Sequence, residues 1–238
     1  MRSFRQIKFA EPPRVSAQTP HSDSRSLLHE ICASHISHQN SVHPQGKVLL
    51  AEGEPAHGIY ILRSGRTTSS ISSHEGRVVI LRIAVAGDVL GLNSVLRSSS
   101  YDTTVKTIEP CHTDFISSVD LLKLMDRSKP ATCAILKILS RELTELADRT
   151  TSLLLPKTAV ARLARLLLEW SDDAGVNNSR IVQINKNFTQ EEIGQMICSS
   201  RETVTRLLAM LSRRQIVQIT SDRIVIQDRS ALQDLALR

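Results

Sequence analysis

The chain has 238 residues, of which 41% are hydrophobic and 23% charged, with a formal net charge of +6. This composition is typical of one large or two small globular domains and excludes a disordered chain. No stretch approaches the ~18 apolar residues of a membrane span, and residues 1–26 lack the apolar core of a signal peptide. The four scattered cysteines disfavour a disulfide scaffold or a cysteine zinc site and fit a reducing cytoplasm. We therefore expect a cytoplasmic protein without membrane contact.

The first 24 residues are polar and contain three prolines without any periodicity, which predicts a mobile extension over residues 1–24. From Val42 to about Ile116, short runs rich in β-branched residues are separated by turn glycines. This pattern predicts an all-β barrel or jelly roll, which we place in a domain over residues 25–125. The expected strands are VLL (48–50), IYIL (59–62), VVILRIAV (78–85) and TVKTI (104–108), with a hairpin turn at HEG (74–76).

A long helix is predicted over residues 126–155, with Pro130 in its first turn and Pro156 after its end. Its apolar positions step by four and three over about three heptads, which is typical of two helices packed along their length. The pattern predicts a dimerisation helix, although a helix packed on its own domain is the alternative. The predicted dimer seam consists of Leu136, Leu139, Leu143, Leu146 and Leu153.

The remaining residues, 156–238, alternate between helical and strand patterns. We expect helices at 157–171, 190–197 and 200–213, a strand at 180–184, a strand pair at 216–219 and 223–226, and a short closing helix. Thr189 and Glu192 match a capping box, and residues 198–200 form a tight turn between two helices. This order predicts a winged helix-turn-helix domain, so the whole chain is α+β.

The helix at 200–213 has two distinct faces. Val204, Leu207, Leu208 and Leu211 form the buried face, opposite Glu202, Thr205, Arg206 and Ala209, with Arg201 beside them. Such a polar face suits a major groove, because Arg can bond guanine and Glu can accept from cytosine. The alternative is an ordinary helical hairpin in which Glu202 pairs with Arg206, or in which Ser199 and Glu202 form a capping box.

The segment EIGQMICSSRETVTRLL (192–208) resembles the DNA-reading segment of the CRP/FNR superfamily of bacterial transcription regulators. The resemblance covers about residues 27–238, since five glycines also match turn positions of the family's cyclic-nucleotide-binding β-roll. It implies a homodimeric, sequence-specific regulator that is not an enzyme and whose partners are double-stranded DNA and RNA polymerase. It implies base contacts by Arg201, Glu202 and Arg206, and backbone contacts by Thr189, Gln190, Ser200 and Thr203. The matching glycines are Gly46, Gly53, Gly65, Gly87 and Gly91.

Two departures from the family pattern affect these expectations. Cys198 stands where the family usually has glycine, so we expect local backbone strain at the turn. In the effector pocket, Leu92 replaces the ribose-binding Glu, and Asp102 replaces the Arg that holds the cyclic phosphate. Because a carboxylate repels a buried phosphate, we expect no cyclic AMP binding, and an effector that is different or absent. The pocket residues implied by the resemblance are Gly91, Leu92, Asp102, Thr103 and Thr104.

Other site patterns carry less weight. His29, Cys32, His35 and His38 are spaced by three and could offer metal ligands, but plain packing is the expected role and no metal or cofactor is assigned. His112 and Asp114 could be proposed as a catalytic pair, but no third group accompanies them. The alternative to a DNA-binding function is an effector-binding module that controls a partner protein. The sequence leaves the effector, the target genes and the sign of regulation open.

Overall fold

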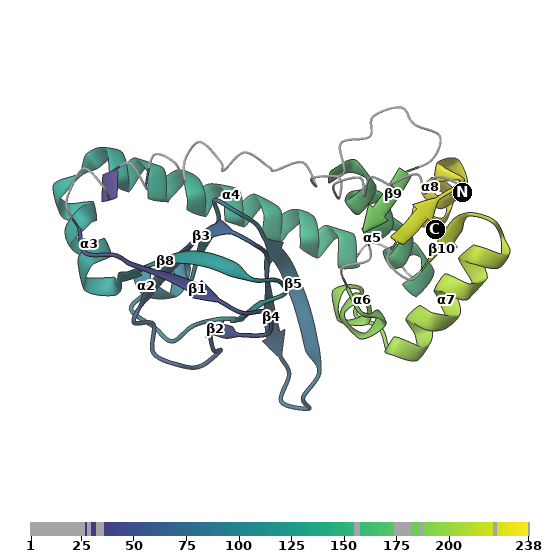
Figure 1. Ribbon diagram of the computed structural model, residues 1–238, viewed down its shortest axis with the longest axis horizontal. Helices are drawn as coiled ribbons and strands as arrows, with labels where there is room; N and C mark the ends of the chain where they lie inside the picture. Colours follow the sequence, from purple (N-terminus) through teal and green to yellow (C-terminus); the bar gives the residue numbers. More distant parts are fainter. Residues whose placement is uncertain are drawn as a thin grey trace, which may run out of the picture.

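The computed structural model describes residues 27, 30–31, 36–154, 158–173, 182–185, 188–220 and 223–237. These residues form an N-terminal β-roll, a long helix that runs along it, and a C-terminal domain of helices and strands (Figure 1). The predicted α+β order is confirmed. The extension predicted over residues 1–24 lies outside the described residues.

The β-roll consists of two four-stranded sheets in which all neighbouring strands are antiparallel. One sheet has the order β1 (Gln39–His43), β8 (Cys111–Ser117), β3 (Gly58–Ser64), β6 (Val89–Leu90). The other has the order β2 (Val48–Leu50), β7 (Thr104–Thr107), β4 (Thr67–Ser72), β5 (Val78–Ala84). The four predicted strands correspond to β2, β3, β5 and β7, and the predicted hairpin turn joins β4 to β5. Gly76 adopts a φ of 78° in that turn, which favours glycine.

The helices α2 (Leu92–Leu96), α3 (Ser118–Arg127) and α4 (Lys129–Leu154) accompany the roll. The helix predicted to begin at residue 126 begins instead at Lys129. Ser128 adopts an extended conformation and ends α3, and its hydroxyl accepts from the Ala131 amide at 3.2 Å, which caps α4. One face of α4 packs on the roll through Ala131, Ala134, Ile135 and Ile138.

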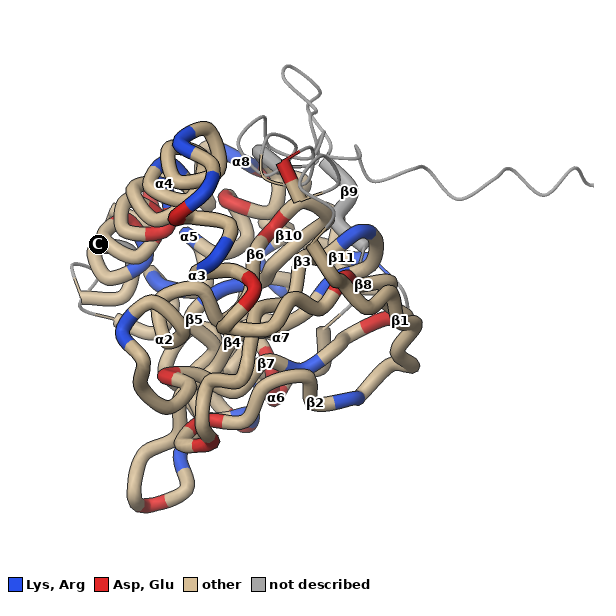
Figure 2. Tube along the Cα trace, turned by 90° about the vertical axis from the view of Figure 1, so that its left-hand side faces the viewer, with Lys and Arg blue, Asp and Glu red and all other residues tan. Residues whose placement is uncertain are grey.

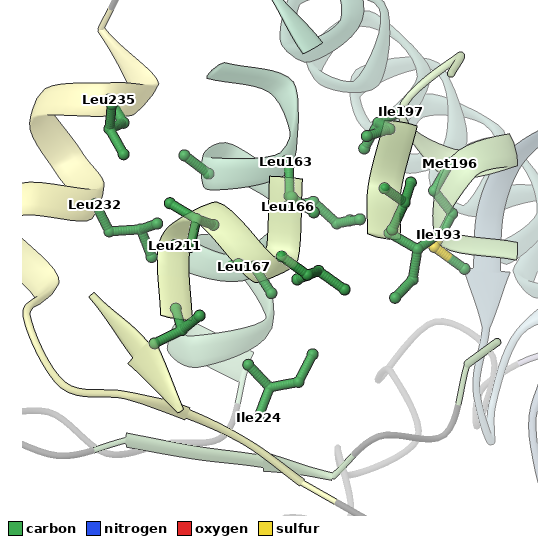
Figure 3. Packing of buried hydrophobic residues seen from close by; sticks show 14 of the residues in the cluster. Leu163, Leu166, Leu167, Ile193, Met196, Ile197, Leu211, Ile224, Leu232 and Leu235 are labelled. Atoms are coloured by element: carbon green, nitrogen blue, oxygen red, sulfur yellow. The ribbon is translucent and has the colours of Figure 1, made fainter. Parts of the chain in front are cut away.

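The C-terminal domain contains the helices α5 (Ala159–Asp173), α6 (Gln190–Met196), α7 (Arg201–Arg213) and α8 (Arg229–Ala236). Its sheet has the order β10 (Val217–Ile219), β11 (Arg223–Ile226), β9 (Val182–Asn185). Figure 3 shows the core of this domain, in which leucines of α5 meet Ile193 and Met196 of α6 and Leu211 of α7. The predicted winged helix-turn-helix is thus present.

The two domains also touch directly. Ile80 of β5 is 3% exposed and belongs to the same apolar cluster as Ile193 and Met196 of α6. Ile83 and Ile108, both partly buried, pack against this cluster as well. The β-roll therefore contributes side chains to the core on which the helix-turn-helix rests.

Candidate nucleic-acid interface and effector cavity

The first helix of the helix-turn-helix starts at a complete capping box. Oγ1 of Thr189 accepts from the Glu192 amide at 3.1 Å, and Oε2 of Glu192 accepts from the Thr189 amide at 2.8 Å. These two bonds satisfy amides that a helix start leaves without partners. The predicted capping box is confirmed.

The turn between α6 and α7 is tight. Cys198 has a φ of 51°, so the predicted backbone strain is present. The Ser199 amide donates to the Gly194 carbonyl at 2.8 Å, and a Cβ on Gly194 would lie 2.7 Å from the Ser199 carbonyl oxygen. Gly194 is therefore required for close approach of the turn to α6. Gly194 was not predicted as a structural residue, although a lone glycine inside a short amphipathic helix is a usable signal.

Ser200 is the N-cap of helix α7, and its hydroxyl accepts from the Thr203 amide at 3.2 Å. The cap is thus Ser200, and the alternative of a Ser199–Glu202 capping box is not formed. Val204, Leu208 and Leu211 are buried, whereas Leu207 is partly buried. On the opposite face the exposed side chains are those predicted: Arg201, Glu202, Thr205, Arg206 and Ala209.

The polar face of α7 is available for an external partner. Among the described residues, no ion pair joins Glu202 to Arg206, so the hairpin alternative lacks its pair. The pKa of Glu202 lies below its usual value, because a backbone amide and the Ser200 hydroxyl donate to its carboxylate. Glu202 is therefore a charged acceptor at neutral pH. Helix α7 lies at the outer side of the C-terminal domain, away from the roll (Figure 1).

The expected backbone-contacting residues lie along the start of each helix. Thr189 and Ser200 are exposed N-cap residues, whereas Gln190 and Thr203 are partly buried. The Ser200 hydroxyl also lies 3.1 Å from Oγ1 of Thr203. The structure thus brings Thr189 and Gln190 together at one helix start and Ser200 and Thr203 at the other.

A cavity of about 330 Å³ lies between the β-roll and α4. Gly91, Leu92, Asp102 and Thr103 line it, as the resemblance implies, but Thr104 does not belong to the lining. The Thr104 hydroxyl instead accepts from the Glu52 amide at 3.1 Å. The wall that α4 and β5 contribute was not predicted from the sequence, and its α4 residues are distant in sequence from the predicted pocket residues. That wall consists of Leu81, Arg82, Glu142, Glu145, Leu146 and Arg149.

Charged side chains of the cavity already have hydrogen-bond or ion-pair partners. Asp102 accepts from Asn93 at 2.7 Å and lies 3.5 Å from Arg97. Arg82 lies 3.2 Å from Glu145 and 3.6 Å from Glu142. Acidic and basic residues are interspersed along α4, as Figure 2 shows.

Glu142 is a partly buried carboxyl of this wall. Burial raises its pKa above the usual value, and the carboxylates of Asp88 and Glu145 add to the effect, while Arg82 and Arg141 oppose it. Burial is the largest cause of this shift, so the charged form of Glu142 is disfavoured in this wall.

The predicted dimer seam is largely uncovered in the single protomer. Leu136, Leu143 and Leu146 are 58%, 71% and 49% exposed. Leu139 is partly buried against the core of the roll, and Leu153 is partly buried. The seam thus offers an apolar stripe, although Leu139 also serves the protomer's own core.

The remaining candidates are the possible metal ligands and the possible catalytic pair His112 and Asp114. His29, Cys32 and His35 lie outside the described residues, and the His38 ring nitrogen contacts the Ile36 carbonyl at 3.2 Å. Asp114 is buried and accepts from Arg63 at 2.5 Å and Asn40 at 3.0 Å, whereas His112 is exposed. The Asp114 carboxylate is therefore held by Arg63 and Asn40, not by His112. Within the described ranges, no helix combines the length and apolarity needed to cross a membrane.

Comparison with known proteins matches both halves of the chain to families. The family described as a cyclic nucleotide-binding domain matches residues 41–128, and the Crp-like helix-turn-helix domain matches residues 161–235. The chain is 26% identical over 190 residues to the CRP-like cAMP-activated global transcriptional regulator of Mycobacterium tuberculosis, covering 79% of this chain and 84% of that protein. It is also 26% identical to the fumarate and nitrate reduction regulatory protein of Yersinia pestis, covering 81% and 76% of the two chains.

Solved structures share the fold. FixK2 from Bradyrhizobium japonicum superposes with a TM-score of 0.69 at 23% identity, over 84% of this chain and 98% of that one. The c-di-GMP responsive regulator CLP of Xanthomonas campestris gives a TM-score of 0.73 at 19% identity, over 85% and 98%. With a cyclic-nucleotide-binding domain, a long connecting helix and a Crp-like helix-turn-helix in this order, the chain belongs to the CRP/FNR family of transcription regulators.

Proposed function

We propose that this regulator works in the cytoplasm as a homodimer that reads a two-fold symmetric site in double-stranded DNA through α7. The observation that carries the proposal is the exposed polar face of α7, opposite an apolar face in which Val204, Leu208 and Leu211 are buried. Arg201 and Arg206 would bond guanine, and the Glu202 carboxylate would accept from cytosine N4. Thr189, Gln190, Ser200 and Thr203 would contact or position the phosphate backbone.

The dimer would form along α4. Three leucines of the predicted seam are about half exposed or more in the protomer, and a second copy of the helix would cover them. A two-fold axis between the copies would place the two α7 helices on half-sites about one helical turn, ~34 Å, apart. Bound beside a promoter, such a dimer would present its surface to RNA polymerase, the further partner that we propose.

The cavity is proposed as the effector site. Its volume of about 330 Å³ lies within the range of small-molecule pockets, and apolar side chains such as Val89, Leu90 and Val105 line it. Leu92 and Asp102 cannot hold a ribose and a cyclic phosphate, and Arg82 is paired with three carboxylates. The effector would therefore be a small molecule other than cyclic AMP, unlike that of the M. tuberculosis relative.

Selection of binding sites from random duplex DNA tests the proposal. The purified protein should enrich a palindrome with G·C pairs in each half-site, and a variant with Arg201, Glu202 and Arg206 changed to alanine should enrich none. Without enrichment by the wild-type protein, the reading of DNA by α7 is wrong, and control of a partner protein becomes the better explanation.

A further inference from the structure

Two arginines from outside the helix-turn-helix hold the end of α6. Nη2 of Arg149, on α4, donates to the Met196 carbonyl at 2.6 Å. Nε of Arg162, on α5, donates to the Ile197 carbonyl at 2.7 Å. Carbonyls at a helix end lack partners within the helix and carry its partial negative charge, so cations are favourable there. The end of α6 is thus fixed by α4 and α5 immediately before the tight turn that leads into α7.

Arg149 also belongs to the wall of the cavity. Its side chain is 17% exposed, and Nη1 lies 3.6 Å from Oε2 of Glu169 on α5. Its Nε is buried and has no hydrogen-bond partner among the described residues. Burial lowers the pKa of Arg149, and the Glu169 carboxylate opposes this effect. One guanidinium therefore stands at the junction of the cavity, α5 and α6.

Strand β5 gives the same two regions a second connection. Leu81 and Arg82 line the cavity, whereas Ile80 and Ile83 pack with the core around α6. The strand carries an irregularity at this point, since Ser69 pairs with Arg82 and Ser70 with Ile80. Such an irregularity changes the direction in which neighbouring side chains point. Neighbouring residues of one strand thus form part of the cavity wall and part of the support of α6.

We propose that Arg149 is a positioning residue for the DNA-reading helix. From its place in the wall of the effector cavity, it holds the end of α6 and therefore also the turn into α7. The inference rests on the proposed reading of DNA by α7. A cavity ligand with an acceptor group near Arg149 would compete with the Met196 carbonyl for the guanidinium. A ligand bound in the cavity would then alter the turn at residues 197–200 of the same protomer.

Hydrogen exchange on the full chain without DNA tests the positioning role. The reporters are the amides of the turn and the start of α7, above all the Ser199 amide that donates to Gly194. In Arg149→Met, exchange over residues 197–203 should be roughly tenfold faster, as expected when a charged hydrogen bond that orders a segment is lost. Arg149→Lys, which keeps the charge, should recover part of the protection.

Arg141→Met is the matched control. Arg141 lies on the same helix with a side chain 20% exposed, but it pairs with Asp88 and Glu145 and not with α6. It should leave exchange over residues 197–203 unchanged. The proposal is overturned if Arg149→Met leaves this segment unchanged, if Arg141→Met changes it equally, or if the increase spreads evenly over α5 to α8. Should Arg149→Met fail to fold, the comparison of Arg149→Lys with Arg141→Lys decides by the same criteria.

Binding of selected duplex DNA by the same variants is measured separately. Weaker DNA binding of Arg149→Met together with faster exchange supports both the positioning of α6 by Arg149 and the reading of DNA by α7. If exchange is faster in Arg149→Met but even the wild-type protein binds no DNA, the positioning of α6 by Arg149 stands. The proposed function is then overturned instead.

Discussion

The Thr205 hydroxyl on α7 donates a hydrogen bond to Oε1 of Gln190 on the first turn of α6, with 2.5 Å between the two oxygens. The same hydroxyl also lies 3.0 Å from the Arg201 carbonyl. The bond to Gln190 joins the two helices on the exposed side of the motif. Gln190 therefore fixes the relative position of α6 and α7, and its amide nitrogen can in addition donate to a phosphate.

Gln190→Ala should weaken binding to all DNA sequences to a similar extent, because a phosphate contact carries no base information. Thr205→Val is the matched variant, since it removes the hydrogen bond but leaves Gln190 in place. We expect it to cost about 1 kcal/mol in DNA binding, less than Gln190→Ala. Titration of several duplexes at one salt concentration measures both. Equal losses would mean that Gln190 acts only through Thr205.

Arg206→Ala should cost roughly 1–3 kcal/mol in binding and relax the preference at one base pair, because a bidentate contact to guanine is lost. Arg213→Ala is the control, since Arg213 is exposed at the other end of the same helix. Site selection with both variants at fixed salt gives the comparison. An unchanged preference at every base pair in Arg206→Ala would show that this face of α7 does not read bases.

Leu143→Lys combined with Leu146→Lys should convert the dimer into a monomer. Both side chains are exposed in the protomer, so lysine is tolerated there, whereas burial of two charges in a dimer interface is costly. Leu139 is the poorer choice, because it also packs against the core of the roll. Sedimentation equilibrium measures the mass.

The control for this pair is Val119→Lys with Leu122→Lys, two exposed apolar positions on α3. These substitutions should leave the dimer unchanged. If the Leu143 and Leu146 variant still sediments as a dimer while its helix content is normal, the stripe on α4 is not the dimer interface.

The helix-turn-helix was predictable because its signals are local. The cap at Thr189, the buried positions Val204, Leu208 and Leu211, and the strained Cys198 all lie within one short segment. Strand β4 was not predicted, since its buried Thr67, Thr68 and Ser69 have no apolar alternation. It is held by pairing with β5 on one side and β7 on the other.

The support of the reading motif was not predictable from the sequence either. Arg149 and Met196 are 47 residues apart, and Arg162 and Ile197 are 35 apart. Nothing near either arginine in the sequence indicates that its guanidinium meets a helix end. Only the packing of α4 and α5 against α6 brings these groups together.

Calorimetry with cyclic AMP should show no binding in the micromolar range, which corresponds to roughly −8 kcal/mol. The physical reason is the carboxylate of Asp102 in the cavity, together with the buried Leu92 and the absence of an unpaired arginine among the described lining residues. The cAMP-activated relative from M. tuberculosis serves as the positive control under the same conditions. A clear micromolar isotherm for this chain would contradict the proposed pocket chemistry.

Glu142→Gln should stabilise the protein, and more so as the pH rises. Since burial raises the folded-state pKa of Glu142 above the usual value of 4.5, the folded protein holds this proton more tightly than the unfolded chain does. Its stabilising contribution is complete below about pH 4.5 and is lost as the pH rises through the folded-state pKa. Glutamine does not titrate, so the difference in melting temperature between variant and wild type should grow from pH 4.5 upward and then level off. Thermal unfolding at a series of pH values measures this difference. A difference that is constant with pH, or that shrinks as the pH rises, would show that Arg82 and Arg141 outweigh the effect of burial on Glu142.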